Sequence, residues 1–244
     1  MPKYQVREGA ESYGHAVGVL LLDCSEPFIP GDVANATTYP YPVLFRTVPG
    51  LTIDAALSGD PELEEAVVEG ALALERHGVR GITSNCGFLL HYQEAVAAAV
   101  AVPVLLSSLL QLPVIAASLG PERAIGVVTA NSRRLGNDLL RRSGVKAETV
   151  LHVAGLEAAP EFKRSMLDQC GVLDSDRLRD ETVAVARGLA ERHPEIGAIL
   201  FECAVLPPYA HAVQEATGLP VFDFVTMIDY LHAGSHRQSY PGAY

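Results

Sequence analysis

Two cysteines, Cys86 and Cys203, stand at matching places in an internal repeat. Laying one on the other superimposes further identical pairs: Ile82 on Ile199, Leu89 on Leu206, Tyr92 on Tyr209, Val96 on Val213 and Pro103 on Pro220. If the two thiols face each other, one thiolate can remove a proton from a carbon acid while the opposite thiol delivers one to the other face. Such a pair inverts a stereocentre without a cofactor, so the repeat predicts proton-transfer chemistry. Cys24 and Cys170 have no matching partners and are interpreted as packing residues.

Each of the paired cysteines follows a short apolar run and precedes a helical segment. The runs predicted as strands are 16–22, 81–83, 103–106, 125–129, 198–201 and 220–222, and the clearest predicted helices are 61–77, 132–143 and 176–193. Apolar runs separated by helices are typical of parallel sheets that are covered on both faces. Ligands of open α/β sheets bind at the carboxyl ends of the strands, so both thiols are expected in one crevice. The helix N-terminus after each cysteine is expected to favour the thiolate.

The repeat divides the chain into two similar lobes, with predicted bounds 1–119 and 120–244. We therefore predict an α/β fold in which each lobe is a parallel sheet flanked by helices. A pseudo-two-fold axis relates the lobes, and the site lies between them. The proline-rich segment 27–49 is expected near the strand ends, as a lid or a subunit contact.

Composition and motifs exclude several classes of function. There are 18 basic and 29 acidic residues, a net charge of −11, which argues against nucleic acid because phosphate binding needs clustered Lys and Arg. The uncharged segment 95–120 is interrupted by Pro103 and Pro113, so it is predicted as buried core and not as a membrane span. Cysteine and histidine spacings fit no structural metal site, and no nucleotide-binding glycine motif occurs, so neither metal nor cofactor is expected. The polar N-terminus and free thiols favour a cytoplasmic location.

The residues around both cysteines resemble the aspartate/glutamate/hydantoin racemase superfamily. The resemblance lies in Thr-Ser-Asn-Cys-Gly-Phe at 83–88 and Glu-Cys-Ala-Val-Leu-Pro-Pro-Tyr at 202–209, and it extends over nearly the whole chain. The superfamily comprises cofactor-independent racemases, maleate isomerases, arylmalonate decarboxylases and algal-type dimethylsulfoniopropionate lyases. Retention of both cysteines is similar to the racemases, isomerases and lyases, whereas the decarboxylases resemble a one-cysteine version.

Further candidate site residues follow other predicted strands. The resemblance implies that the loop with Thr129, Asn131 and Ser132 holds the substrate carboxylate, and an ordinary helix cap is the alternative. Asp23 follows the first strand and is a candidate for the same role. Other candidates flank the cysteines: Asn85 could steer the thiol, the backbone of Gly87 and Phe88 could bind a carboxylate, and Glu202 could act as a base or bind a substrate cation.

We predict a cofactor-independent racemase or isomerase of a small carboxylate, such as an amino acid. A lyase or decarboxylase on the same scaffold is the alternative, and a two-lobed small-molecule-binding protein is the non-enzyme alternative. A Cys–His hydrolase using His91 or His211 is disfavoured because both histidines lie well inside the following helices. The apolar stretch around 105–119, together with the superfamily resemblance, favours a homo-oligomer, either a dimer or a tetramer.

Overall fold

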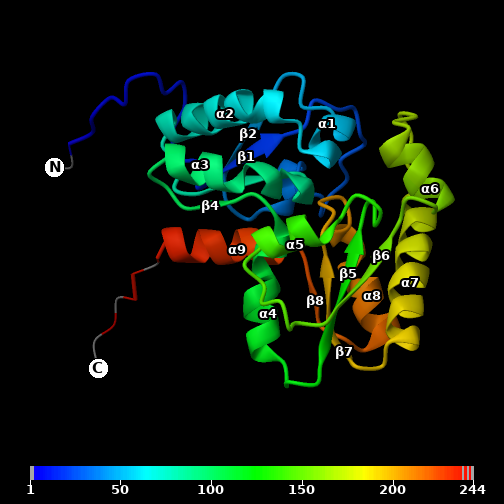
Figure 1. Cartoon of the computed structure of the whole chain (residues 1–244). Helices are drawn as coiled ribbons and strands as arrows, with labels where there is room; N and C mark the ends of the chain where they lie inside the picture. The colour runs from blue at the N-terminus through cyan, green and yellow to red at the C-terminus, as the bar shows by residue number, and fades with distance from the viewer. Residues whose placement is uncertain (1–2, 238, 241, 243–244) are drawn as a thin grey trace.

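Two parallel four-stranded sheets form the centre of the molecule (Figure 1). The computed structural model describes residues 3–237, 239–240 and 242, so the outermost ends of the two predicted lobes lie outside the described residues. The strands of the first sheet are β1 (Val17–Leu21), β2 (Val43–Thr47), β3 (Ile82–Ser84) and β4 (Val104–Leu105). Those of the second are β5 (Ala124–Thr129), β6 (Leu151–Gly155), β7 (Ile196–Phe201) and β8 (Val221–Phe222).

The two sheets have the same topology, which confirms the predicted pair of similar lobes. Their strand orders are β2-β1-β3-β4 and β6-β5-β7-β8, and all neighbouring strands are parallel. The central strands β5 and β7 are buried along their whole length, as expected for sheets covered on both faces. The edge strands β2 and β6 were not predicted, because their side chains are half-buried or exposed and give no continuous apolar run.

Helices cover both sheets and connect the strands (Figure 1). The α-helices are α1 (Ile53–Ser58), α2 (Glu64–Arg76), α3 (Gln93–Ala99), α4 (Leu112–Ser118), α5 (Asn137–Arg142), α6 (Pro160–Phe162), α7 (Ser175–Arg192), α8 (Ala210–Thr217) and α9 (Phe224–Ser235). Shorter helical turns are η1 (Ala36–Thr38), η2 (Pro61–Leu63), η3 (Gly87–Tyr92), η4 (Ser108–Gln111), the π-helical η5 (Lys163–Leu167) and η6 (Pro207–Tyr209).

Two of the predicted helices are close to the observed ones, and the third was predicted too long. Segment 61–77 is η2 followed by α2, and segment 176–193 is α7. Segment 132–143 becomes helical only at α5, because the side chain of Asn131 accepts the N–H groups of Arg133 and Arg134 and closes a separate turn. Gly136 then has extended backbone angles and serves as the cap of α5.

Each lobe sends one helix to the sheet of the other lobe. Helix α4 follows the first sheet in sequence, yet its Leu112 and Ile115 pack with Ile125 and Leu200 of the second sheet. Helix α9 ends the second lobe, yet it packs with β1 of the first sheet in another buried cluster. The lobes are therefore tied together by exchanged helices, and the strand ends on either side of the crevice are held in a fixed relation. Within the described part of the chain, no helix has the length and apolar character that crossing a bilayer requires.

Candidate active site

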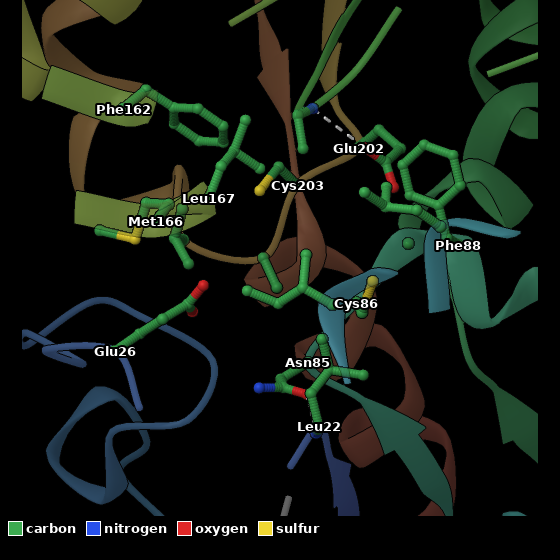
Figure 2. A pocket seen from close by; sticks show the side chains of 16 residues that line it. Leu22, Glu26, Asn85, Cys86, Phe88, Phe162, Met166, Leu167, Glu202 and Cys203 are labelled. Atoms are coloured by element: carbon green, nitrogen blue, oxygen red, sulfur yellow. Dashed lines mark hydrogen bonds between the residues drawn. The ribbon is translucent and has the colours of Figure 1, made fainter. Parts of the chain in front are cut away.

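A pocket lies where the carboxyl ends of the two sheets face each other (Figure 2). Its cavity has a volume of about 40 Å³, so a ligand larger than a few water molecules requires the lining side chains to move apart. Six of the residues predicted from the sequence line it: Asn85, Cys86, Gly87 and Phe88 after β3, and Glu202 and Cys203 after β7. The internal repeat therefore places both thiols in one crevice, as its symmetry predicts.

The two thiols have equivalent backbone partners. The N–H of Phe88 donates to the Cys86 sulfur, and the N–H of Val205 donates to the Cys203 sulfur, two residues along in each case. Burial nevertheless raises the pKa of both thiols well above the ordinary value, and the nearby charge of Glu202 raises it further. The expectation that the following helical turns make both residues thiolates is therefore not met. Both sulfurs are neutral at rest and need a positive charge or a base to ionise.

Glu202 is a buried carboxyl group between the two cysteine loops. Its Oε2 accepts a hydrogen bond from the Thr129 hydroxyl at 2.7 Å and a longer one from the Ala130 N–H at 3.4 Å. Its Oε1 is buried and has no partner among the described residues. Burial raises the pKa of Glu202 to about 7, so this group exchanges a proton near neutral pH. A buried oxygen without a partner inside a pocket is a candidate for contact with a ligand or a moving proton.

Gly87 allows the close approach of Glu202 to the Cys86 loop. A Cβ atom at position 87 would overlap both the Oε1 and the backbone carbonyl oxygen of Glu202. The side chain could turn away, but the carbonyl belongs to the chain after β7 and cannot move without shifting Cys203. Glycine is therefore required here by space and not by backbone angle.

We expect Gly87→Ala to destabilise the fold by roughly 1–3 kcal/mol, as overpacking usually does. The substitution should also lower activity, because the two cysteine loops must separate. Chemical denaturation and turnover measure the two effects. Gly136→Ala is the matched control, since a Cβ there meets nothing within 4 Å. Wild-type stability and turnover in Gly87→Ala would show that the two loops are not in contact.

Asn85 is oriented by the backbone of the first strand. Its Oδ1 accepts the N–H of Leu22 at 2.9 Å, which fixes the side-chain amide. The amide nitrogen Nδ2 forms the opposite end of this side chain, and Asn85 lines the pocket. Asn85 therefore presents a hydrogen-bond donor at the pocket, which suits a carboxylate oxygen of a ligand.

Glu26 also lines the pocket and was missed from the sequence. Its carboxyl group points into the cavity from the loop after β1 (Figure 2). Burial, and then the charge of Asp32, raise the pKa of Glu26 to about 8. Asp23 was the residue predicted at the end of the same strand, but its side chain is exposed and accepts the N–H of Gly50. The only sequence signal for Glu26 was that it is an acidic residue a few positions after Asp23 in the same loop.

An apolar wall of the pocket was also missed. Phe162, Met166 and Leu167 come from α6 and the π-helical turn η5, and they face the cysteines in Figure 2. A single π-helical turn often marks a functional site, because it re-aims side chains that a regular helix would direct elsewhere. The wall gives the pocket an apolar side opposite its hydrogen-bonding groups.

Four of the predicted site residues do not line the pocket. These are Asp23, Thr129, Asn131 and Ser132. The hydroxyl of Thr129 donates to Glu202, and the side chain of Asn131 caps the turn before α5. The Ser132 hydroxyl donates to Glu157 Oε1 at 2.6 Å. His91 and His211 also do not line the pocket. A Cys–His hydrolase mechanism that uses either of them is therefore not supported.

Solved structures with this fold include racemases and an arylmalonate decarboxylase. Allantoin racemase from Pseudomonas fluorescens superimposes with a TM-score of 0.65 at 19% identity, over 89% of each chain. A cysteine-containing mutant of arylmalonate decarboxylase gives a TM-score of 0.61 at 18% identity, over 93% of this chain and 97% of that one. At these identities the likeness shows that the fold is shared.

Comparison with curated protein sequences assigns the chain to one family. A dimethylsulfoniopropionate lyase from Durusdinium sp. clade D is 34% identical over 226 residues, which are 90% of this chain and 74% of that protein. Dimethylsulfoniopropionate lyase 6 of Emiliania huxleyi is 36% identical over 222 residues, 86% of this chain but 57% of the relative. The chain belongs to the family of these lyases, and it spans about half the length of two Emiliania huxleyi members, lyases 5 and 6. A scan against protein-family models gives no match.

Proposed function

We propose that this chain is a lyase that eliminates a sulfonium leaving group from a small carboxylate. Dimethylsulfoniopropionate, the compound in the names of the relatives, is the proposed substrate. This was the alternative to racemisation in the sequence analysis, and two kinds of support now favour it. One is membership of the lyase family, and the other is the charge of the pocket.

The charge of the pocket carries the proposal. Its titratable lining consists of the carboxyl groups of Glu26 and Glu202 and the two thiols, and none of the described lining residues is Lys, Arg or His. A dicarboxylate such as aspartate or glutamate would bring a second anionic group into a site without a cationic side chain. A zwitterion with one carboxylate and one sulfonium group matches the site better, because its cation can pair with a carboxylate.

Each end of such a zwitterion has a complement in the pocket. Once deprotonated, the side chain of Glu26 supplies an anion for the sulfonium group, and the apolar wall of Phe162, Met166 and Leu167 suits its methyl groups. The Nδ2 of Asn85 and the backbone after Cys86 offer donors for the carboxylate. The acidic carbon between these two ends is thereby held near the thiols.

The elimination needs one base and no external proton donor. A thiolate removes a proton from the carbon next to the carboxylate, and those bonding electrons form the carbon–carbon double bond. The bond from the neighbouring carbon to sulfur breaks with its electron pair moving to sulfur. The products are acrylate and neutral dimethyl sulfide, and the proton leaves the thiol to water. A sulfonium cation in the pocket lowers the pKa of the thiols by Coulombic attraction, so the substrate itself favours the thiolate.

We expect kcat/KM to rise with pH, because every reactive group works in its deprotonated form. In the free enzyme the pKa of Glu202 is about 7 and that of Glu26 about 8, and burial raises the thiols further. Protonated Glu26 cannot pair with a cation, and a protonated thiol cannot accept the carbon-bound proton. A rate profile from about pH 6 to about pH 9 measures this, since kcat/KM reports the groups of the free enzyme. A profile that falls over this range would contradict the assignment.

The proposed substrate class is tested by comparing cationic and neutral ligands of the same shape. Dimethyl sulfide release from dimethylsulfoniopropionate is followed by gas chromatography of the headspace. 3-(Methylthio)propionate, which lacks the positive charge, should bind weakly and release no volatile product. Equal inhibition by this neutral analogue and by a cationic, non-eliminating analogue would show that the pocket does not select for the cation.

Racemisation remains the second candidate because of one observation. The two cysteines have matching backbone partners, at Phe88 and Val205, as expected if each thiol serves one face of a stereocentre. An elimination needs only one of them as the base. The family relationship and the acidic pocket favour the lyase, and the cysteine variants discussed below separate the two reactions.

A further inference from the structure

Two histidines and a glutamate meet at the end of the second sheet that is remote from the pocket. His152 is the second residue of β6, His193 follows α7, and Glu195 directly precedes β7. The pocket is formed by residues that follow β7, so this cluster lies at the opposite end of the same strand (Figure 1). It is not part of the active site.

The side chains of the cluster converge on one carboxylate oxygen. His152 Nε2 lies 2.7 Å from Glu195 Oε1, and His193 Nδ1 lies 3.7 Å from the same atom. The two imidazole rings are stacked, with centroids 3.6 Å apart and planes inclined by 16°. One donor atom from each residue lies within 4.8 Å of the others.

We propose that His152, His193 and Glu195 form a binding site for a divalent transition metal ion of the zinc type. Two imidazole nitrogens and one carboxylate oxygen are ligands that zinc, nickel and copper accept. Calcium and magnesium take mainly oxygen ligands in larger number, so they do not fit this donor set. All three side chains are partly open to solvent, which leaves the remaining coordination positions to water.

The backbone around the cluster is fixed, so only side-chain rotations are needed to close the site. His152 belongs to a strand paired along its length with β5. The carbonyl of His193 accepts the N–H of Ile196, and the carbonyl of Glu195 accepts the N–H of Ala124. At bond lengths of about 2.0–2.1 Å, tetrahedral ligands lie roughly 3.3 Å apart, so the ligand atoms must approach by at most about 1.5 Å from the present limit of 4.8 Å.

No sequence pattern indicates this site. Its ligands come from β6 and from the loop between α7 and β7, and their spacing along the chain matches no metal-binding motif. Only the pairing of β5 with both β6 and β7 brings the three side chains together. A bound ion would connect the edge strand β6 to the start of β7, so it should stabilise the second lobe.

Isothermal titration of the full chain with Zn²⁺ tests the proposal. The Cys86→Ser/Cys203→Ser background is used, because two thiols and a carboxyl group in the pocket could also bind zinc. We expect saturable binding of one ion and a rise in melting temperature with zinc, since an ion that binds only the folded state stabilises it. Excess Mg²⁺ should not compete.

His193→Asn is the decisive variant, because His193 caps a helix at the surface and asparagine is tolerated in such a position. It should weaken zinc binding by at least about tenfold, the loss that even an outer-sphere partner typically causes, and abolish the zinc-dependent rise in melting temperature. His211→Asn is the matched control, since within the described ranges the ion pair of that exposed histidine is with a single carboxylate, Glu215 at 3.5 Å. The proposal is overturned if the protein that retains His193 shows no saturable zinc binding, or if His193→Asn binds zinc with unchanged affinity.

Discussion

Cys86→Ser and Cys203→Ser are expected to lower dimethyl sulfide release by unequal factors. A positioned general base contributes roughly 10²- to 10⁴-fold, so the variant that loses the base should fall by that amount. The other thiol only polarises or positions the substrate, so its loss should lower the rate by a smaller factor. Serine keeps the size and the hydrogen bond from the backbone N–H but cannot form a comparable anion. Initial rates at several pH values measure both losses.

The control for these variants is Cys170→Ser, which removes an exposed thiol that does not line the pocket. It should retain wild-type turnover. Racemisation predicts a different pattern, because each thiol serves one face of the carbon. Both variants would then stop inversion equally, while the remaining thiol still exchanges the α-proton of one enantiomer. Equal losses accompanied by such exchange would support the racemase and contradict the lyase.

Glu26→Gln is expected to raise KM for the sulfonium substrate by roughly ten- to a hundredfold, since a contact with a charged group contributes about 1.5–3 kcal/mol. The variant keeps the shape of the side chain and removes its charge. Binding of a neutral ligand such as 3-(methylthio)propionate should not weaken. Because the pKa of Glu26 is about 8, the variant should also lose the part of the pH profile that this group produces.

Asp23→Asn is the matched control for Glu26→Gln. It removes an acidic group from the same loop, but one that is exposed and outside the pocket. If both variants change KM equally, the effect comes from the overall charge of the loop and not from a contact in the pocket. An unchanged KM in Glu26→Gln would show that Glu26 does not pair with the cation.

The internal repeat made the fold and the two cysteines predictable. Identical residues around Cys86 and Cys203 define equivalent strand ends, and the sheet topology follows from those. The edge strands β2 and β6 were not predictable in the same way, because a half-exposed strand lacks a distinct apolar pattern. The exchange of α4 and α9 between the lobes is a tertiary arrangement that no local pattern encodes.

Residues on loops were the least predictable part of the site. The course of the Glu26 loop depends on distant contacts, including the Ser25 N–H to the Gln169 side chain and the Val33 N–H to the Ala204 carbonyl. Thr129 was selected as a ligand donor, but its hydroxyl faces Glu202, because the strands β5 and β7 are neighbours. Strand ends therefore predict where the site is, and the packing of the loops decides which polar groups face it.

Proton NMR in deuterium oxide tests the central claim most directly. The full chain is incubated in parallel with dimethylsulfoniopropionate and with single enantiomers of small amino acids. The account predicts that vinyl signals of acrylate replace the methylene signals of the sulfonium substrate, and that the amino acids neither invert nor exchange. Inversion of an amino acid with deuterium at the α-carbon, and no alkene from the sulfonium compound, would contradict it.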